Sequence, residues 1–247
     1  MTHTGLRTVR VAAIHELVID EIRRAVEMWV YRPGDLLPSE RDMAEAMGVS
    51  RNTVRTATAI LESEGFLSVR RGRAGGYRVE DPALADDRGE EIRRRPQEVQ
   101  RVWDYRIAVD VGAARLAAEH RTAADLRELR RLLQELAPAY RVYEREKSLD
   151  NARKVQALDS QFHVAIARST SNDFIVDAVL DARRRLWVAY SSYLTRLDPD
   201  SEHRRVGIVD ALRRRDADLA EQLMREHLTA GRGQFERWLA SSDEPPA

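Results

Sequence analysis

Residues 33–79 constrain the fold of this chain more than any other stretch, because they place two short helices and a hairpin in immediate succession. Ser39 and Ser50 each precede a run of helically spaced apolar residues, and serine is a favoured N-cap. Gly48 separates the runs, as the turn of a helix-turn-helix requires. After Gly65, two short segments alternate apolar and polar residues like strands. This order predicts a winged helix-turn-helix, whose second helix enters the DNA major groove.

The second helix of this motif has one apolar side and one polar side. Its expected buried stripe, at spacing i, i+3, i+4, i+7, consists of Val54, Ala57, Thr58 and Leu61. Arg51, Asn52 and Arg55 face away from that stripe, in the first turn and a half. Groove-reading helices present their N-terminal residues to bases and phosphates, where the helix dipole also favours an anion. These three residues are therefore candidate DNA contacts.

The motif carries a positive charge that the whole chain lacks. The chain balances 41 Lys and Arg against 41 Asp and Glu, whereas residues 50–78 hold six Arg against two Glu. A helix cap, an exposed Arg pair or a Gly-rich turn is common by itself on proteins that do not bind DNA. In this order and at these lengths they indicate DNA, and a neutral total charge does not exclude phosphate contacts.

The segment LPSERDMAEAMGVSRNTVR, followed by EGFLSVRRGRAGGYRV, resembles the DNA-binding domain of the GntR regulators. The resemblance covers about the first third of the chain. It implies a homodimer on a short inverted-repeat operator of double-stranded DNA. The DNA contacts that it implies come from Arg41, Ser50, Arg51, Asn52 and Arg55, with a wing-tip contact at Gly72.

Beyond residue 95 only helical patterns appear, so we expect a mainly α protein. The expected helices span residues 97–120, 123–149, 152–168, 173–197, 203–215 and 217–239, and form an all-α bundle of six or seven helices. The expected domains are a winged helix-turn-helix with a small β-hairpin wing at 1–80, a charged linker at 81–95, and an effector-binding and dimerisation domain at 96–240.

Several classes of protein are disfavoured by what the sequence lacks. It has no cysteine, which excludes a disulfide framework and thiolate chemistry. No signal-peptide pattern and no apolar run of membrane-spanning length occur, so we expect a cytoplasmic protein without a membrane partner. No HExxH, GxSxG or phosphate-binding loop is present, which argues against an enzyme.

Polar residues on apolar helix stripes mark candidate sites in the second half. Asp159 and His163 stand four residues apart, each one position round from an apolar stripe, at the border of the core. This spacing suits a divalent metal, although an Asp–His pair at i,i+4 is by itself more often a partly exposed polar contact. His227 lies on the same helical stripe as Leu219 and Leu223 and should therefore face inward. It is either a metal ligand or a histidine of the core.

Arg106 lies on an apolar stripe and therefore needs an anion near its guanidinium. The stripe consists of Val99, Val102, Val109 and Ala113. The anion is either Asp110, four residues on, or a bound carboxylate.

Three segments of the second half resemble the FCD effector domain of the FadR-type GntR subfamily. They are RIAVDVGAARLAA from Arg106, DSQFHVAIARSTSN from Asp159, and DALRRRDADLAEQLMREHL from Asp210. The resemblance implies a pocket with Arg106 as anion partner, and with Asp159, His163 and His227 as ligands of a divalent metal such as zinc. Asn172 matches a frequent asparagine of such pockets, and a helix N-cap is its alternative role.

One position departs from the FCD pattern. Such domains usually carry a further histidine about 22 residues before the last one, and this chain has Arg205 there, on the stripe of Ile208, Val209 and Leu212. Two arrangements follow. Either His203 turns inward and a metal is held, or Arg205 is itself the cation and pairs with Asp159 and an anionic effector.

The sequence thus predicts a ligand-responsive bacterial transcription regulator, expected to be a repressor, whose DNA affinity depends on a small organic acid. Two other classes remain as alternatives. One is a metal-dependent hydrolase built on Asp159, His163 and His227. The other is a ligand-independent architectural DNA-binding protein, which would leave the inward polar groups of the bundle unexplained.

Overall fold

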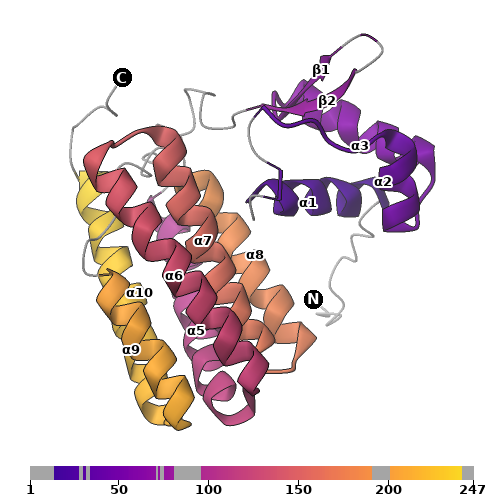
Figure 1. Cartoon of the computed structure of the whole chain (residues 1–247). Helices are drawn as coiled ribbons and strands as arrows, with labels where there is room; N and C mark the ends of the chain where they lie inside the picture. The colour runs from indigo at the N-terminus through magenta and orange to yellow at the C-terminus, as the bar shows by residue number, and fades with distance from the viewer. Residues whose placement is uncertain are drawn as a thin grey trace, which may run out of the picture. The chain divides into compact units, whose positions relative to one another are not determined.

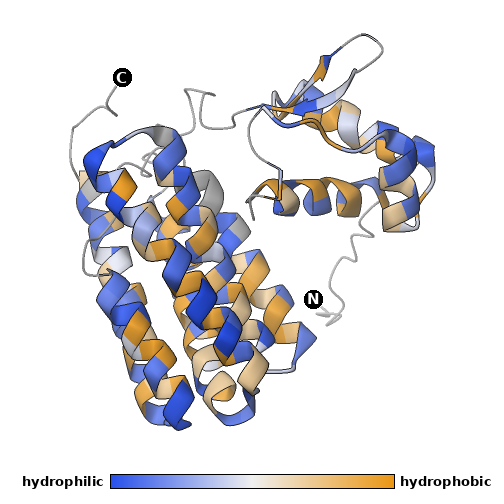
Figure 2. Cartoon of the chain, in the orientation of Figure 1, coloured by the Kyte–Doolittle hydropathy of each residue, from blue (hydrophilic) through white to orange (hydrophobic). Residues whose placement is uncertain are grey.

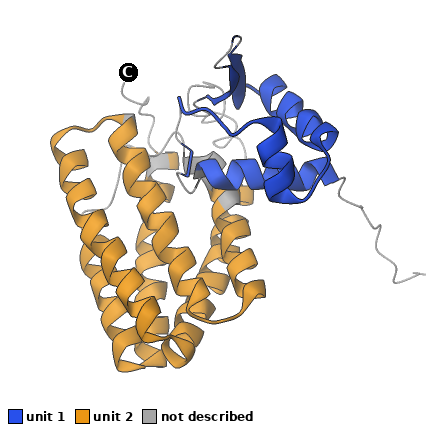
Figure 3. Ribbon diagram, turned by 45° about the vertical axis from the view of Figure 1, so that its right-hand side comes forward, with its two compact units in different colours: residues 1–26, 30–82 blue, residues 27–29, 83–247 orange. Residues whose placement is uncertain are grey.

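The computed structural model describes residues 14–27, 30–31, 34–70, 72, 75–80, 96–190 and 201–240. Contacts divide these residues into two compact units, which we describe separately (Figure 3). The first comprises nearly all of the first helix and the described residues from 30 to 80, and the second the described residues from 96 onward. The predicted linker at 81–95 lies outside the described residues.

The first unit has the element order of a winged helix-turn-helix (Figure 1). Its helices are α1 (Ile14–Glu27), α2 (Glu40–Met47) and α3 (Arg51–Ser63), and its strands are β1 (Leu67–Arg70) and β2 (Gly76–Val79). The strands pair antiparallel, from Leu67 opposite Val79 to Arg70 opposite Gly76. The predicted wing is therefore confirmed as a two-stranded sheet.

Local hydrogen bonds explain where these helices begin and end. The Ser39 side chain accepts from the Asp42 backbone N–H, and that of Ser50 accepts from the Thr53 N–H. Each serine thus satisfies a donor that a helix N-terminus leaves without a partner. Gly48 ends α2 at φ 66°, and Gly65 has φ 71°; a β-carbon disfavours this left-handed conformation.

The polar side of α3 is exposed because its other side closes the core of this unit. Val54, Ala57 and Leu61 have no exposed surface, as their spacing predicts. Thr58 is buried on the same stripe, and its hydroxyl donates to the Val54 carbonyl oxygen at 3.0 Å. Residues of α1 and of the hairpin complete the cluster, among them Ile22, Val26, Leu67 and Val79.

The second unit is a bundle of helices packed side by side (Figure 1). Its helices are α5 (Pro96–His120), α6 (Ala123–Arg145), α7 (Leu149–Arg168), α8 (Asp173–Tyr190), α9 (Ser201–Arg214) and α10 (Ala217–Ala240). The mainly α class and the bundle are confirmed. In the described part of the chain no helix is both long enough and apolar enough to cross a membrane.

The boundary between α6 and α7 differs from the prediction. A helix was expected to run through residues 123–149 and the next to begin at 152, but α6 ends at Arg145 and α7 starts at Leu149. Ser148 is the N-cap of α7 and accepts from the Asn151 N–H at 3.4 Å. The capping serine overrides the continuing helical pattern. Residues 191–197, the last part of the helix expected at 173–197, lie outside the described residues.

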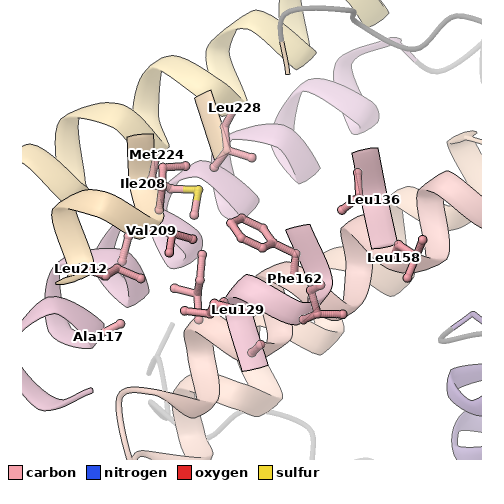
Figure 4. Packing of buried hydrophobic residues seen from close by; sticks show 14 of the residues in the cluster. Ala117, Leu129, Leu136, Leu158, Phe162, Ile208, Val209, Leu212, Met224 and Leu228 are labelled. Atoms are coloured by element: carbon pink, nitrogen blue, oxygen red, sulfur yellow. The ribbon is translucent and has the colours of Figure 1, made fainter. Parts of the chain in front are cut away.

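Residues of α7 contribute to the hydrophobic core of the bundle. Phe162 of α7 has no exposed surface and points among leucines of α6 and apolar residues of α9 and α10 (Figure 4). The helices of the bundle each carry both hydrophobic and hydrophilic residues (Figure 2). This packing fixes the rotation of α7 and brings the polar residues beside Phe162 into the interior.

Candidate functional site

The first turns of α3 present polar side chains to solvent. Arg51, Asn52 and Arg55 are all exposed, on the side opposite the buried stripe. Ser50 caps the helix and shares a 2.8 Å hydrogen bond with the Thr53 hydroxyl. Arg41 on α2 is exposed over 73% of its side chain. The structure thus leaves these candidate DNA contacts accessible.

A carboxylate holds Arg55 in place. Arg55 donates from Nε to Glu40 Oε1 at 3.2 Å and from Nη2 to Oε2 at 2.8 Å, and the Tyr77 hydroxyl donates to Oε1 at 3.3 Å. Hydrogen bonding from Arg55 is the main cause that lowers the pKa of Glu40 below its ordinary 4.5, against a smaller opposing effect of burial. Glu40 therefore joins α2 to α3 through its ion pair with Arg55, and to β2 through the hydrogen bond from Tyr77. No sequence pattern had indicated this role of Glu40.

The wing tip depends on glycine. Gly72 is exposed and has φ 121°, which side chains rarely tolerate. The Gly75 N–H donates to the Gly72 carbonyl oxygen at 2.9 Å. A β-carbon at Gly75 would collide with the carbonyl oxygen of Arg70 and lie 2.8 Å from that of Gly72. The close turn brings the two strands together at the position expected to contact DNA.

The second unit contains a cluster of charged and polar side chains in its interior, which we call the arginine cluster. Its members are Arg106 and Asp110 of α5, Asp159 and His163 of α7, Arg183 of α8, Arg205 of α9 and His227 of α10. Five of the seven residues are buried, and the side chains of the other two, Asp159 and Arg183, are only 16% and 9% exposed. Five helices converge on it.

Asp159 is the centre of this cluster. Its Oδ1 accepts from Arg205 Nη2 at 2.6 Å and Nε at 3.0 Å, and its Oδ2 accepts from Arg183 Nη2 at 2.7 Å. Arg106 Nη2 lies 4.0 Å from Oδ2. Two guanidinium groups thus occupy both carboxylate oxygens through hydrogen bonds, and a third lies within ion-pair distance.

The two histidines lie against each other beside this carboxylate. His163 Nδ1 is 2.7 Å from Asp110 Oδ1, which leaves Nε2 facing Arg106 Nη2 at 3.4 Å and Asp159 Oδ1 at 3.7 Å. The His163 and His227 rings stack, with centroids 5.4 Å apart. Arg106 Nε lies 3.6 Å from the second oxygen of Asp110. The predicted pair of Arg106 with Asp110 is therefore present as an ion pair.

The charges of the cluster follow from its pKa shifts. Burial raises the pKa of Asp159, but the positive charges of Arg205 and Arg183 outweigh it and hold the pKa well below its usual range. Burial lowers the pKa of His227 well below 6.5, and the charge of Arg205 lowers it further. Burial likewise lowers the pKa of His163, against the opposing attraction of Asp110. Both imidazoles are therefore neutral at pH 7.

Three of these residues could supply metal ligands. Asp159, His163 and His227 offer ligand atoms that all lie within 4.8 Å of one another, and within the described ranges His203 is not part of this group. A cation bound to Asp159, however, would share that carboxylate with the guanidinium groups of Arg183 and Arg205. Like charges so close repel strongly in a buried site. The residues present therefore do not fit a metal ion while these ion pairs are formed.

The structure corrects three expectations about single residues. His163 is completely buried rather than at the border of the core, because Phe162 fixes the rotation of α7. His203 is exposed, since α9 already begins at Ser201 and turns it away from the cluster. Asn172 is exposed, and its Oδ1 accepts from the Phe174 N–H at 3.0 Å, so it forms the helix cap that was its alternative role, while its role toward an effector stays a prediction. Arg205 points inward, as its stripe predicts.

Arg183 was missed by the sequence analysis, although a signal for it exists. It lies at i+7, i+4 and i+3 from Val176, Val179 and Leu180, the same register that identified Arg106. The run Arg183-Arg184-Arg185 hides this register, because such a run is typical of a solvated helix face.

Comparison with known proteins matches both units. The model of "Bacterial regulatory proteins, gntR family" covers residues 14–75, and that of the FCD domain covers residues 101–230. This chain belongs to the gntR family of bacterial regulatory proteins. It is a transcriptional regulator with an FCD effector domain, and the family and its relatives are regulators rather than enzymes. Regulators of this family bind DNA and small-molecule effectors and usually work as dimers, and FCD domains can bind metal.

Curated relatives extend over most of this gntR regulator. The Uxu operon transcriptional regulator of Escherichia coli K12 is 30% identical over 228 residues, which are 84% of this chain and 80% of the relative. The HTH-type transcriptional repressor NanR of Cronobacter sakazakii is 24% identical and covers 97% of this chain and 91% of its own length.

A solved structure has the same fold. E. coli McbR/YncC is 18% identical, with a TM-score of 0.52, and the match covers 92% of this chain and 99% of that one. At this identity the likeness concerns the fold alone.

Proposed function

We propose that this regulator is a homodimeric repressor that binds a short inverted-repeat operator through α3 and the wing. The observation that carries the proposal is the exposed first turn of α3, where Arg51, Asn52 and Arg55 project from a helix whose other side is buried. An exposed N-terminal turn with two guanidinium groups suits base edges and phosphates of the major groove. Arg41 and the wing tip at Gly72 add contacts to the backbone on either side.

The choice of repressor over activator is supported by a relative. The repressor NanR matches 97% of this chain, so its whole architecture corresponds to that of this regulator. A homodimer is supported by two observations. Regulators of this family usually work as dimers, and an inverted repeat has two half-sites, each of which receives one copy of α3.

A small carboxylate is the effector class that we infer for the FCD domain. The support is the arginine cluster, in which Arg106, Arg183 and Arg205 gather around two carboxylates in the interior of the bundle. Guanidinium groups bind carboxylates with two parallel hydrogen bonds. Binding there changes contacts among five helices, and through them the relative placement of the DNA-binding units of a dimer. An architectural protein without an effector would leave unexplained the buried Nε and Nη1 of Arg183, which have no hydrogen-bond partner among the described residues.

The experiment is a selection of DNA by the full-length protein. A pool of duplexes with a random central region is bound to the protein at fixed salt, and the bound duplexes are amplified and sequenced over several rounds. We expect enrichment of one inverted repeat, and a loss of affinity for it of roughly 5- to 150-fold in Arg51→Ala. Arg115→Ala, which removes a 43% exposed side chain of α5, serves as the matched control and keeps wild-type affinity. If no sequence is enriched, the proposed function is wrong.

A further inference from the structure

The arginine cluster carries more positive than negative charge. Three guanidinium groups, from Arg106, Arg183 and Arg205, face two carboxylates, from Asp110 and Asp159. Among these five side chains the positive charges therefore outnumber the negative charges by one. A buried charge without a counter-ion is costly, so the cluster favours one additional negative charge.

Hydrogen-bond donors in the cluster also lack acceptors. Nε and Nη1 of Arg183 are buried and have no hydrogen-bond partner among the residues that the structure describes. Toward the residues that the structure describes, this guanidinium donates through Nη2 alone, to Asp159 Oδ2 and the Ser160 hydroxyl. His227 Nδ1 is buried and unpartnered within the same part of the chain. Buried N–H groups without acceptors cost free energy that a ligand oxygen would recover.

Arg205 stands where the resemblance to FCD domains implies a further histidine, and each of its three nitrogens donates a hydrogen bond. Nε and Nη2 bind Asp159 Oδ1, and Nη1 donates to the Ser201 hydroxyl at 2.9 Å. Ser201 in turn donates to the Tyr140 hydroxyl at 3.2 Å. Side chains of α6 and α9 thus support the guanidinium in its orientation toward Asp159. This arrangement occupies the carboxylate that a metal would need.

We propose that the FCD domain of this regulator binds a small carboxylate without a metal ion, with the guanidinium groups of Arg205 and Arg183 replacing the metal's positive charge. Arg205 neutralises Asp159, and Arg183 offers its free N–H groups to the ligand carboxylate. The ligand contributes one negative charge at this position, which matches the excess in the cluster. The inference rests on the proposed function in that the carboxylate is the regulator's effector.

Metal content gives the first test. The full-length protein, without a polyhistidine tag, is incubated with excess Zn²⁺, freed of unbound ion by gel filtration, and analysed for zinc by mass spectrometry. We expect far less than equimolar zinc on the wild type. Arg205→His removes the opposing charge and adds a nitrogen ligand beside Asp159, His163 and His227, so we expect it to retain equimolar zinc and to melt at a higher temperature with zinc.

Two results would overturn the proposal. One is equimolar zinc on the wild type, a measurement that does not depend on whether any variant folds. The other is an Arg205→His variant that is folded by circular dichroism and retains no more zinc than the wild type.

Acetate, as the simplest carboxylate, gives the second test. The melting temperature of the metal-free protein is measured while sodium acetate replaces sodium chloride at constant ionic strength. We expect acetate to raise the melting temperature of the wild type. We expect the same rise in the control variant Arg115→Gln, which alters an arginine of α5 that pairs with Asp218 and Glu221. We expect no rise in Arg183→Gln. An equal response in Arg183→Gln, or none in the wild type, would overturn the carboxylate assignment.

These outcomes are distinct from a failure of the proposed function. Zinc on the wild type would contradict the metal-free site and leave operator binding untouched. Failure of the DNA selection would contradict the operator and leave the zinc and acetate measurements interpretable.

Discussion

Arg205 binds Asp159 through two N–H groups, with Nη2 at 2.6 Å and Nε at 3.0 Å from the same carboxylate oxygen. This contact joins α9 to α7 at the point where a histidine and a metal would otherwise be expected. It makes Asp159 part of an ion-pair network rather than an available ligand. In the FCD domain of this regulator, arginine side chains thus hold Asp159.

The ion pairs of Asp159 should be essential for the stability of the bundle. Asp159→Asn removes the charge that compensates Arg205 and Arg183, and breaking a buried pair from one side costs about 3–5 kcal/mol. Urea unfolding followed by circular dichroism measures this loss. Asp218→Asn is the matched control, because that carboxylate is 89% exposed and pairs only at the surface. Equal stability of the two variants would contradict the described network.

Phe162 should contribute strongly to the stability of the bundle. Its side chain is completely buried, and Phe162→Ala should lower the free energy of unfolding by about 3–5 kcal/mol through lost burial and the remaining cavity. Phe174, on the first turn of α8, is 87% exposed, so Phe174→Ala should change the free energy of unfolding by less than about 0.5 kcal/mol. Chemical denaturation of both variants makes the comparison, and similar losses would contradict the packing.

Glu40 should stabilise the DNA-binding unit in a pH-dependent way. Its pKa in the folded protein is lowered below 4.5, chiefly by the hydrogen bond from Arg55. A lowered folded pKa means that the contribution is complete above the unfolded pKa and disappears as the pH falls through the folded one. Glu40→Gln should therefore melt at a lower temperature than the wild type at pH 7. The difference should close on acidification below pH 4.5.

The same substitution should also weaken DNA binding, because Arg55 loses the partner that orients it. Melting curves of the wild type and Glu40→Gln at pH 7, 5 and 3 test the effect on stability. Fluorescence anisotropy with labelled operator at pH 7 tests the effect on DNA binding. A gap in melting temperature that stays constant over this pH range would contradict the assignment of the ion pair.

Gly75 should be required for the shape of the wing. Gly75→Ala introduces a β-carbon that collides with the Arg70 carbonyl oxygen, so the hairpin must distort and its basic tip moves away from the backbone of the operator. We expect weaker operator binding and unchanged helix content. Gly112→Ala on α5 meets no atom within 4 Å and is the control. Wild-type affinity of Gly75→Ala would show that the wing tip does not contact DNA.

The helix-turn-helix could be predicted almost completely from sequence, because its signals are local. Caps at Ser39 and Ser50, the left-handed turn at Gly48 and the stripe of α3 each depend on neighbours within one or two turns. The end of α6 was missed because helical periodicity continues past Arg145, and only the cap at Ser148 interrupts it.

The interior site could be predicted only in part. Apolar stripes identified Arg106, Arg205 and His227 as inward residues. Arg183 was not found, since its neighbouring arginines resemble a solvated face. Nor does one helix reveal which residues of other helices it meets: the bonds from Arg205 and Arg183 to Asp159 join positions 46 and 24 residues apart. Such contacts follow from packing rather than from periodicity.

The central claim is that a carboxylate in the arginine cluster controls DNA affinity, and one titration tests it directly. Anisotropy of the selected inverted repeat is followed with full-length protein while small mono- and dicarboxylates are added at constant ionic strength and without metal. We predict that at least one acid changes the dissociation constant for DNA by roughly 5- to 150-fold, and that Arg183→Gln loses this response. An affinity that no acid alters, or an undiminished response in Arg183→Gln, would contradict the account.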